Sequence, residues 1–457
     1  MASSDPNEAR EHAVVIGASM AGLVAAAALA PHYRRVTVLE RDILPDGPDN
    51  RRGVPQGKHA HGIQPGGVQA LDQLLPGIVD ELVMAGAPVG DLSLAGSWMV
   101  GGGYLARGEA GVPGIGVTRP FLEYRVRSRV AALPGVTFRD GVEVLRLLAE
   151  DPHRVHGVEL APAGGGTTER LEADLVLDAT GKVSKLPQWL ATLGYPAPAE
   201  ERVHCKMAYL TRRWQLASPE PAPDLVTIVT PAESPHFGVM IAQEDGTHIL
   251  TMGGLLDSGP ARTDEAYLAF AAGLANPAIA NALVGATAVT DLQPSHFPAS
   301  ARRRYDKLRS FPAGLLALGD SIASFNPMYG QGMTVAALQA VALRDLLAGG
   351  PLNARKFFGR AHRIADVAWK IATGGDLRFD AVEGRRTTSG KIMNRYLDRL
   401  TLAARTDPVL SRQFLRVAGF IDGPESFFKP AIVRRVLAGS RKPQQAEQQT
   451  AAPAVAG

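Results

Sequence analysis

The segment of residues 13–40, AVVIGASMAGLVAAAALAPHYRRVTVLE, limits the possible folds more than any other part of the chain. Its first apolar run predicts a short buried strand, the alanine-rich run predicts a helix, and RVTVLE predicts a second strand. A strand, a helix and a strand in this order form a βαβ unit, whose two strands lie parallel in one sheet. We therefore expect an α/β fold with a parallel sheet near the N-terminus.

The turn between the first strand and the helix fits a binding site for the pyrophosphate of a dinucleotide. Gly17, Ser19 and Gly22 occupy the defining positions of G-x-G-x-x-G, with Met20 and Ala21 before the last of them. The first glycine allows the tight turn, a small second residue lets the backbone approach the anion, and the third glycine lets the helix pack on the strand. The free N–H groups at the helix start would then hold the pyrophosphate.

Glu40 ends the second predicted strand, 18 residues after Gly22. A carboxylate in this place accepts hydrogen bonds from a ribose diol and disfavours a ribose that carries a 2′-phosphate. The alternative is a packing turn followed by a surface glutamate, which is the weaker interpretation because the surrounding βαβ unit is present.

A second segment, LLALGDSIASFNPMYGQGMT at residues 315–334, separates the possible dinucleotides. It predicts a buried strand that ends on Asp320 and a helix whose first turn contains Gly330, Gly332 and Met333. Glycines there let a large, flat group lie against the backbone, and a helix N-terminus favours a nearby anion or polarised carbonyl. The isoalloxazine ring of FAD has this shape and gains negative charge on its pyrimidine edge when reduced. Asp320 would bind the ribityl hydroxyl groups.

Charge and cysteine content argue against several other classes of protein. The formal net charge is +3 and the charged residues are interspersed, so the sequence gives no support for nucleic-acid binding. Cys205 is the only cysteine, which rules out an intramolecular disulfide and a cysteine-based metal cluster, and no other metal site is predicted. The first residues lack the features of a signal peptide, and no apolar stretch reaches the roughly 20 residues that cross a bilayer. We expect a soluble, cytoplasmic protein.

The chain of 457 residues is long enough for two closely joined domains. Residues 203–256 alternate apolar and polar side chains, with Asp245-Gly246 as a hairpin signal, and predict an antiparallel sheet. We expect a discontinuous FAD-binding domain over residues 12–85, 118–200 and 300–350, a substrate-binding β-sheet domain over 86–117 and 201–299, a helical region over 351–438, and a disordered tail over 439–457.

Five motifs together resemble the FAD-dependent monooxygenases of the p-hydroxybenzoate hydroxylase class. They lie in the family's order between residues 13 and 380 and read VVIGASMAGL, RRGVPQGKHAHGIQPGG, TRPFLEY, DLVLDATGK and LLALGDSIASFNPMYGQGM. Within this class the chain looks most like squalene epoxidase and the bacterial olefin epoxidases of polyether antibiotic pathways. The resemblance implies a Rossmann-like FAD-binding domain of the glutathione-reductase type, interleaved with an antiparallel-sheet substrate domain and followed by C-terminal helices.

Position by position, the resemblance implies a set of contacts with FAD. Gly17 to Gly22 would bind the pyrophosphate and Glu40 the adenosine ribose. The other implied contacts are Arg41 beside the ribose, Arg52 in the following loop, Arg119 at a helix start near the pyrophosphate or ribityl chain, the backbone of Val144 at the adenine, Asp320 with Pro327, and the N–H groups of Gly330, Gly332 and Met333 at the flavin ring.

The middle motif departs from the family's pattern. Asp-Gly followed by Ser and Arg, which serves both FAD and NAD(P)H in many hydroxylases of the class, appears here as Asp178-Ala-Thr-Gly181-Lys-Val-Ser184-Lys185. Two sources of electrons therefore stay open: NAD(P)H acting directly, or NAD(P)H acting through a separate flavin reductase.

The resemblance implies that one oxygen atom from O2 is inserted, through a flavin hydroperoxide, into a lipophilic natural-product substrate. Olefin epoxidation in a polyketide-type pathway is the first interpretation, and because it needs no protein base, no catalytic residue is predicted beside the flavin. The predicted substrate pocket is mostly apolar. Its candidates are His59 and His61 in the loop, whose alternative is a structural role, and Tyr209, Trp214, Phe237, Met240 and Met252 in the sheet, whose alternative is a place in the core.

Several other functions remain open on the same fold. They are an aromatic hydroxylase, a flavin-dependent prenyl reductase, a flavin-dependent halogenase, and a flavin-binding partner without turnover. The halogenase is disfavoured because its paired tryptophans are missing here. The basic amphipathic helices near the C-terminus also allow membrane association, although packing against the FAD domain is their more ordinary role.

Overall fold

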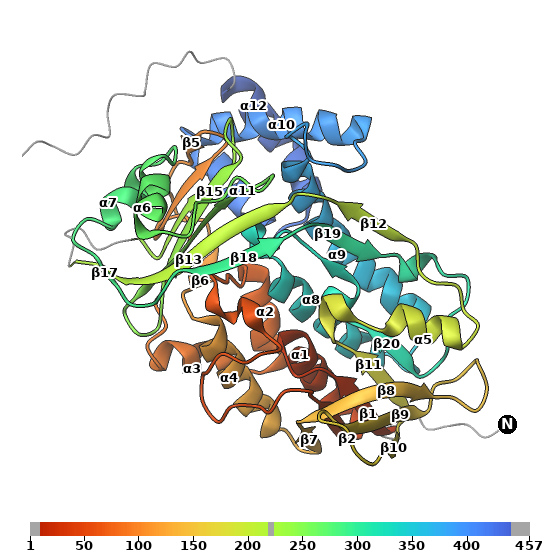
Figure 1. Ribbon diagram of the computed structural model, residues 1–457. Coiled ribbons are helices and arrows are strands. Elements are labelled where there is room, and N and C mark those ends of the chain that lie inside the picture. Colours follow the sequence, from red (N-terminus) through yellow and green to blue (C-terminus); the bar gives the residue numbers. More distant parts are fainter. Residues whose placement is uncertain (1–9, 218–223, 440–457) are drawn as a thin grey trace, which may run out of the picture.

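Five parallel strands form the central sheet, in the order β20-β11-β1-β2-β7. The structure is a computed structural model that describes residues 10–217 and 224–439 (Figure 1). The middle strand carries an unbroken apolar run that is buried throughout, as is typical of parallel strands covered on both faces. The strands are β1 (Arg10–Ile16), β2 (Tyr33–Leu39), β7 (Val136–Arg139), β11 (Leu175–Asp178) and β20 (Leu315–Ala317).

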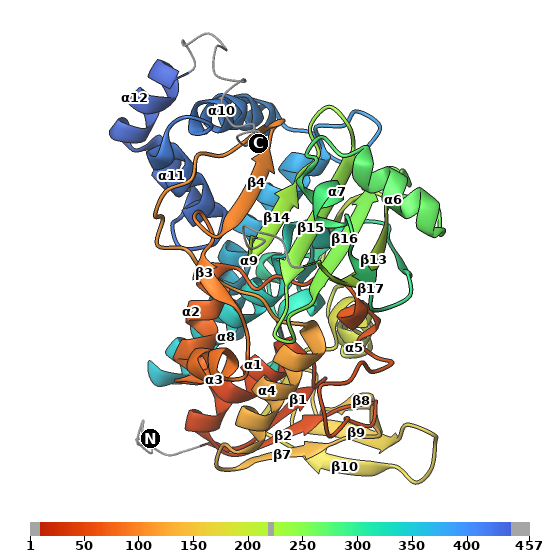
Figure 2. The same ribbon diagram turned by 90° about the vertical axis from the view of Figure 1, so that its left-hand side faces the viewer.

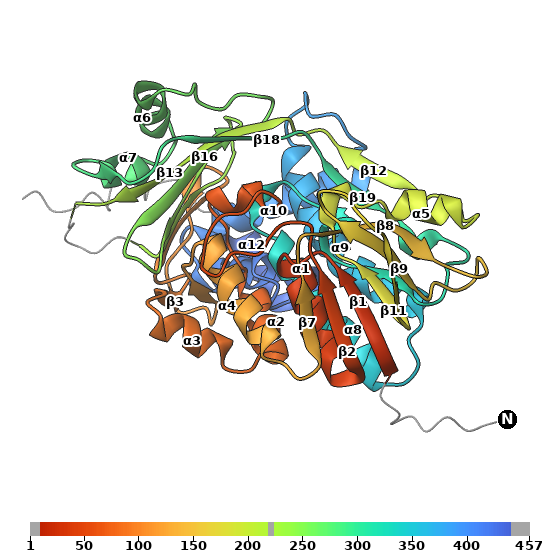
Figure 3. The same ribbon diagram turned by 60° about the horizontal axis from the view of Figure 1, so that its bottom comes forward.

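Helix α1 (Met20–Leu29) connects β1 to the parallel strand β2, which confirms the predicted βαβ unit. It packs against α4 (Arg119–Ala131) and α8 (Gly332–Ala348). Nearly all of its residues are buried, because a helix that is apolar on every side belongs to the core. An antiparallel layer lies against the central sheet (Figure 3) and consists of β8 (Val142–Leu148), β9 (Gly157–Pro162) and β10 (Glu169–Glu172).

A larger, eight-stranded sheet forms a separate layer above the central sheet (Figure 1). The predicted hairpin at Asp245-Gly246 is present: Gly246 has φ +78°, and Gln243 N–H donates to the Thr247 carbonyl at 2.8 Å. The strands within residues 203–256 pair antiparallel as predicted, and β4 adds one parallel pairing, with β14. Its strands are β4 (Gly96–Val100), β5 (Gly103–Tyr104), β13 (Met207–Gln215), β14 (Val226–Val229), β15 (His236–Ala242), β16 (His248–Gly254), β17 (Thr287–Ala288) and β18 (Gln293–Phe297).

The C-terminal helices lie beside the β4 edge of this sheet (Figure 2). Helix α9 (Ala354–Asp376) packs on α8, and the next three helices share a core cluster with residues of the 98–112 segment. These three are α10 (Thr388–Ala404), α11 (Pro408–Ala418) and α12 (Pro430–Gly439). Among the described residues, no helix has both the length and the apolar character that crossing a membrane requires.

The remaining elements connect these layers, and together they confirm the predicted fold class. The tail predicted for residues 439–457 falls, beyond Gly439, outside the described residues, and the predicted domain boundaries stay a prediction. The connecting elements are α2 (Pro65–Leu74), α3 (Ile78–Met84), β3 (Val89–Asp91), β6 (Pro113–Ile115), α5 (Leu186–Thr192), β12 (Glu200–Val203), α6 (Asp264–Ala272), α7 (Ala278–Ala282), β19 (Ser300–Arg303), β21 (Ala323–Ser324), and the short 3-10 helices η1 (Ala30–His32), η2 (Pro55–Lys58), η3 (Gly181–Val183), η4 (Tyr305–Lys307), η5 (Gly319–Ser321), η6 (Pro327–Tyr329) and η7 (Pro424–Phe428).

Candidate functional site

The carboxyl ends of four parallel strands meet at one edge of the central sheet. Ile16 at the end of β1 is in register with Leu39 of β2 and with Asp178 of β11, and Asp178 is in register with Ala317 of β20. The segments that follow these strands therefore lie together. Ligands of open parallel sheets bind outside this edge.

The turn after β1 has the close backbone contacts that its glycines predict. Gly17 has φ +103°, and a Cβ atom there would lie 2.9 Å from the Ala179 carbonyl oxygen. A Cβ atom on Gly22 would lie 1.7 Å from the Gly17 carbonyl oxygen, so no side chain fits. The first turn of α1 has no acidic residue and its N-cap Ser19 makes no side-chain cap. The positive end of the helix dipole can thus bind an anion.

A buried network of charged side chains stands beside this helix start. Arg119 Nη2 donates to Ser19 Oγ at 2.7 Å and to Glu123 Oε2 at 2.9 Å. Arg51 forms ion pairs with Glu123 at 3.0 Å and with Glu40 at 3.1 Å. Burial raises the pKa of Glu123, but Arg119 and Arg51 lower it by more, so this pKa lies below its usual value.

The structure places Arg51 where the sequence analysis expected its neighbour, Arg52. The side chain of Arg51 is 6% exposed and contacts Glu40, whereas Arg52 is exposed. Glu40 itself also accepts a hydrogen bond from the Ala18 N–H at 2.8 Å, which ties the end of β2 to the glycine turn. Arg51 is therefore the arginine of this loop that contacts Glu40, and the FAD contact of Arg52 stays a prediction.

The second predicted segment comes to the same edge. Gly319 and Gly330 have φ +67° and +62°, and a Cβ atom on Gly332 would lie 3.7 Å from Asp320 Oδ1, so the start of α8 stands next to this carboxylate. Burial raises the pKa of Asp320, while Lys182 and Arg119 lower it. The neighbouring Gln331 is buried, and its Oε1 has no partner among the described residues.

A cavity of about 1260 Å³ extends from these residues to the large sheet and the C-terminal helices. Such a volume exceeds the roughly 300–1,000 Å³ of common ligand pockets, so it can hold a cofactor ring and a second molecule. At the cofactor end it is lined by the predicted residues Ser19, Met20, Ala21, Arg119, Asp320, Pro327, Gly330, Gly332 and Met333.

The large sheet contributes only one of its faces to the cavity. Tyr209 and Phe237 line it as predicted. Trp214, Met240 and Met252 do not, because their side chains belong to the core cluster between the sheet and helices α6 and α7. Side chains alternate along a strand, so residues an odd number of positions apart cannot share a face. The prediction for these three residues is wrong for this reason.

The two loop histidines also line the cavity, as predicted. Burial and the nearby Lys58 lower the pKa of His59 to about 4, and burial, Arg119 and His59 lower that of His61 to about 3. Both rings are therefore neutral near pH 7. His61 Nδ1 lies 3.0 Å from the His59 carbonyl oxygen, which can only accept, so Nδ1 carries the proton and Nε2 is an acceptor.

Two buried threonines hold this loop against the sheet. His59 Nδ1 lies 2.8 Å from Thr211 Oγ1, and Thr211 Oγ1 lies 2.7 Å from Thr251 Oγ1. Thr251 Oγ1 also accepts a hydrogen bond from the Ala60 N–H at 3.1 Å. The loop is thus fixed against the sheet and forms part of the cavity lining.

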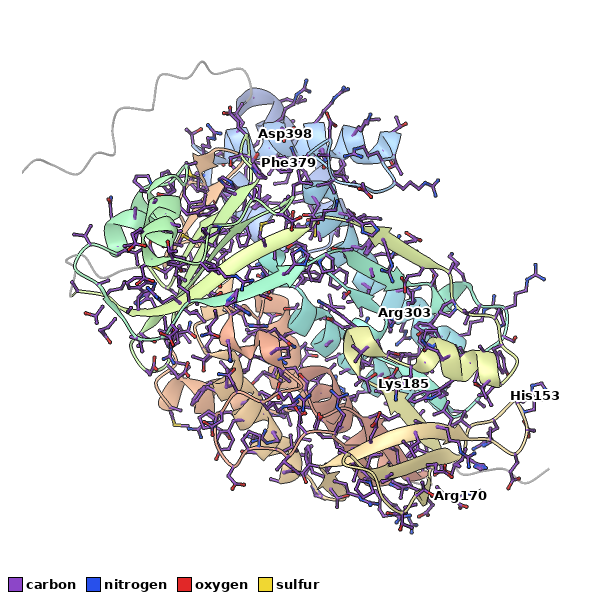
Figure 4. All side chains as sticks on the ribbon, viewed as in Figure 1. His153, Arg170, Lys185, Arg303, Phe379 and Asp398 are labelled. Carbon is purple, nitrogen blue, oxygen red and sulfur yellow. The ribbon has the colours of Figure 1, made fainter. Side chains whose placement is uncertain are left out.

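Sequence reasoning missed two parts of the cavity wall. Lys182 lines it with its ammonium group 4.0 Å from the centre of the Phe297 ring, and burial lowers its pKa although Asp320 raises it. Residues of the C-terminal helices close the far end: Ile371, Asn394, Leu397, Asp398, Phe414, Val417 and Phe427. Asp398 marks this end of the molecule, far from Arg170 at the edge of the β8–β10 layer (Figure 4). The only signal for these helices was their amphipathic pattern.

Six of the predicted cofactor residues do not line the cavity: Gly17, Gly22, Glu40 and Arg52, described above, and Val144 and Arg41. Val144 is buried in β8 opposite Leu160, where a bulge follows it in the strand. Arg41 is exposed, and its charge lowers the pKa of Glu143 after the larger effect of Lys185. Both flank the end of β2 that carries Glu40. No group of residues suited to hold a metal ion is found in the described part of the chain.

The residues at the sheet edge fit FAD. The uncapped start of α1 suits a pyrophosphate, the glycines around Asp320 leave room for a flat ring, and Gln331 Oε1 is a buried acceptor in need of a donor. These are observations on the residues themselves, and they agree with the contacts that the motifs imply.

Comparisons with known proteins give the same result. The family model described as FAD binding domain matches residues 10–350. The chain is 36% identical over 460 residues to Protein Rv3254 of Mycobacterium tuberculosis (strain ATCC 25618 / H37Rv), covering 94% of each chain. It is 28% identical over 371 residues to kynurenine 3-monooxygenase of Salinispora tropica, covering 76% of this chain and 74% of that one.

A solved structure with the same fold is that of the flavin-dependent brominase Bmp2. Its TM-score is 0.65 at 15% identity, and the alignment covers 93% of this chain and 98% of that chain. At this identity the likeness concerns the fold alone. The family match over most of the chain, with the glycine turn and the Gly319-Asp320 segment at one sheet edge, shows that this chain belongs to the FAD-binding domain family and has FAD as its cofactor.

Proposed function

We propose that this protein is an FAD-dependent monooxygenase that inserts one oxygen atom from O2 into a lipophilic small molecule. The observation that carries the proposal is that one cavity is lined both by the residues suited to the flavin and by apolar residues of the sheet and the C-terminal helices. The apolar part of this cavity is called the chamber below. The relative named kynurenine 3-monooxygenase supports the reaction class. The finer proposal is epoxidation of an olefin in a polyketide-type pathway, with hydroxylation of an aromatic ring as its alternative.

The residues around the cavity would hold FAD in three places. The turn from Gly17 to Gly22 and the start of α1 would bind the pyrophosphate, with Arg119 beside it. Glu40 would accept from the adenosine ribose, next to Arg51. Asp320 would bind the ribityl chain, and the backbone of Gly330, Gly332 and Met333 would meet the flavin ring.

The bound flavin supplies the activation of dioxygen, with electrons that come from NAD(P)H. One oxygen atom goes to the substrate and the other leaves as water. The protein's part is to bind, to orient and to exclude bulk water. His61, which is neutral with Nε2 as an acceptor, can orient a hydroxyl or N–H group of a ligand without adding charge to the cavity.

The walls of the chamber favour an apolar substrate. Val239, Ile241 and Ile228 contribute from the sheet, and Leu397 and Phe414 contribute from the C-terminal helices. Apolar ligands gain about 25 cal/mol for each Å² that they remove from water, which suits a large hydrophobic molecule better than a small charged acid. Charged lining residues such as Lys370, Arg378 and Asp398 come from the helical end of the cavity and would meet a polar end of the substrate.

The test is oxygen transfer from ¹⁸O2 by the FAD-loaded protein with NADH or NADPH. A panel of lipophilic olefins and polycyclic aromatics is incubated with and without bromide, and products are identified by mass spectrometry. The proposal expects a product that carries one labelled oxygen atom in both halide conditions. A product that forms only with bromide would replace it by halogenation, and a saturated product without label would replace it by reduction.

A further inference from the structure

Asp376, the last residue of α9, is a buried acid that neither the fold nor the proposed oxygen chemistry explains. Its side chain has no exposed surface. Its Oδ1 accepts hydrogen bonds from Asn326 Nδ2 at 2.9 Å and from Tyr329 Oη at 3.2 Å. Both partners line the cavity, and they belong to the segment of residues 326–331 that leads into α8. Asp376 thus links the C-terminal region to the cofactor end of the cavity.

The surroundings of this carboxyl group hold little to stabilise a charge. Among the described residues Asp376 makes no ion pair, and its Oδ2 has no hydrogen-bond partner. It also sits at a helix C-terminus, where the dipole disfavours a negative charge. Burial raises its pKa to about 7, although the bonds from Asn326 and Tyr329 lower it. Both protonation states are therefore populated near neutral pH.

Two titratable groups that interact with Asp376, Cys205 and Tyr329, do not titrate in this range. Burial raises the pKa of Cys205 to about 12, and burial with Asp376 raises that of Tyr329 well above its ordinary value. Arg378, whose charge lowers the pKa of Tyr329, pairs with Asp398 at 2.5 Å. A step near pH 7 that is lost in Asp376→Asn would belong to Asp376.

The segment of residues 326–331 is held from three sides. The Asn326 N–H donates to Ser300 Oγ at 2.9 Å, and Gln64 Nε2 donates to the Tyr329 carbonyl oxygen at 3.0 Å. Asp376 provides the third attachment and is the one of the three that can change its charge. The segment ends next to Gly332, the first residue of α8.

Helix α9 is shaped to receive Tyr329. A Cβ atom on Gly375 would lie 2.0 Å from Tyr329 Oη, so the tyrosine reaches Asp376 only because residue 375 is glycine. Glycine is less favourable in a helix than alanine. A Cβ atom on the preceding Gly374 would make only an ordinary contact, 3.5 Å from Asn394 Oδ1. The glycine at position 375 is thus explained by the contact with Tyr329, which a side chain at this position would prevent.

We propose that Asp376 is a positioning residue for the cofactor: through Asn326 and Tyr329 it holds residues 326–331 in the conformation that receives the flavin ring, more firmly when ionised. Hydrogen bonds to a carboxylate are about twice as strong as those to a neutral acceptor. Since linkage is reciprocal, FAD binds more tightly as Asp376 loses its proton. The inference rests on FAD as the cofactor and not on the proposed oxygen transfer.

The test is the dissociation constant of FAD, measured by quenching of its fluorescence between about pH 5.5 and about pH 8.5. For the unmodified protein the constant should fall by about threefold to tenfold as pH rises, with a midpoint near 7. Asp376→Asn keeps an oxygen that can accept both bonds but cannot ionise. It should bind FAD at the weaker, low-pH level across the whole range, without a step.

Three further variants, one of them a control, test the proposal if Asp376→Asn does not fold. Tyr329→Phe removes one of the bonds that favour the ionised form, so the midpoint should move to higher pH. Gly375→Ala should weaken FAD binding at every pH by displacing Tyr329, while Gly374→Ala, with the same gain in helix propensity, should not. A flat profile for the unmodified protein, or an unchanged midpoint in Tyr329→Phe, would overturn the proposal.

Discussion

At the level of single residues, Gly22 has the least room for a side chain among the glycines of residues 10–217 and 224–439. Gly22→Ala puts a Cβ atom within 1.7 Å of the Gly17 carbonyl oxygen and forces α1 away from the turn. We expect the free energy of unfolding to fall by about 1–3 kcal/mol, as for other overpacked sites. FAD affinity should fall by about tenfold or more, because the N–H groups of the helix start move with it.

The matched control is Gly164→Ala, because a Cβ atom there meets nothing within 4 Å. Thermal unfolding and FAD fluorescence titration measure both effects. Equal FAD affinity in the two variants would mean that the glycine turn does not bind the pyrophosphate.

The loop after β2 supplies a second prediction, on two adjacent arginines. Arg51→Met leaves three carboxylates, Glu40, Asp42 and Glu123, without their shared buried cation. Loss of one partner of a buried pair costs about 3–5 kcal/mol, so the variant should be less stable and bind FAD more weakly. Arg52→Met changes an exposed side chain, and its stability should stay within about 0.5 kcal/mol of the parent. FAD titration of the folded variants decides between them, and the reverse order would restore Arg52 as the cofactor contact.

Some residues of the candidate site could be predicted from the sequence and others could not. Gly17, Gly22, Glu40 and Asp320 could be found in advance, because a strand, a turn and a helix in direct succession fix their positions. Arg51 and Arg52 could not be separated, since they lie in an irregular loop where no periodicity says which side chain turns inward. Lys182 was missed because it reaches the cavity from a short 3-10 helix whose motif departs from the family pattern.

At the level of elements, strand β15 has one face in the core and the other face towards the cavity. Met240 packs in the core between the sheet and α6, whereas its neighbour Val239 lines the cavity. Met240→Ala should lower the free energy of unfolding by about 2–5 kcal/mol without changing substrate choice. Val239→Phe should cost less stability and exclude the bulkier substrates of an accepted series. Chemical denaturation and product profiles measure the two effects, and a changed substrate range in Met240→Ala alone would contradict the assignment of faces.

The alternation of side chains could have given this division from the sequence. Tyr209 and Trp214 are an odd number of residues apart, as are Phe237 and Met240, so each pair had to be split between the two faces. The parallel pairing of β4 with β14, and the closure of the cavity by α9 to α11, could not be predicted in this way. Both depend on contacts between segments more than a hundred residues apart, for which local pattern carries no signal.

At the scale of the whole molecule, stability should depend on pH through Asp376. Its pKa is about 7 when folded and 3.8 as the ordinary value, so the folded state keeps the proton over a range in which the unfolded chain releases it. The free energy of unfolding therefore falls as pH rises from about 4 to about 7, by up to about 4 kcal/mol, and this contribution is constant above that range.

Asp376→Asn has no carboxyl group at this position and so lacks this pH-dependent contribution. Its free energy of unfolding, relative to that of the parent, should increase between about pH 4 and about pH 7 and then level off. Chemical denaturation of both proteins at one FAD concentration measures the difference. A difference that stays constant with pH would show that the carboxyl group ionises normally in the folded protein.

In the proposed function, one cavity holds both FAD and the molecule that is oxidised, and this arrangement can be tested. Its most direct test is the visible spectrum of the FAD-loaded protein, followed without oxygen as NADH or NADPH is added and again after air is admitted. We expect bound oxidised flavin that is bleached by the nicotinamide, alone or with a lipophilic substrate or an added flavin reductase, and that recovers in air. A purified protein that takes up no FAD, even after reconstitution, would contradict the assignment of Gly17, Glu40 and Asp320, and a bound flavin that no donor reduces would contradict the proposed function.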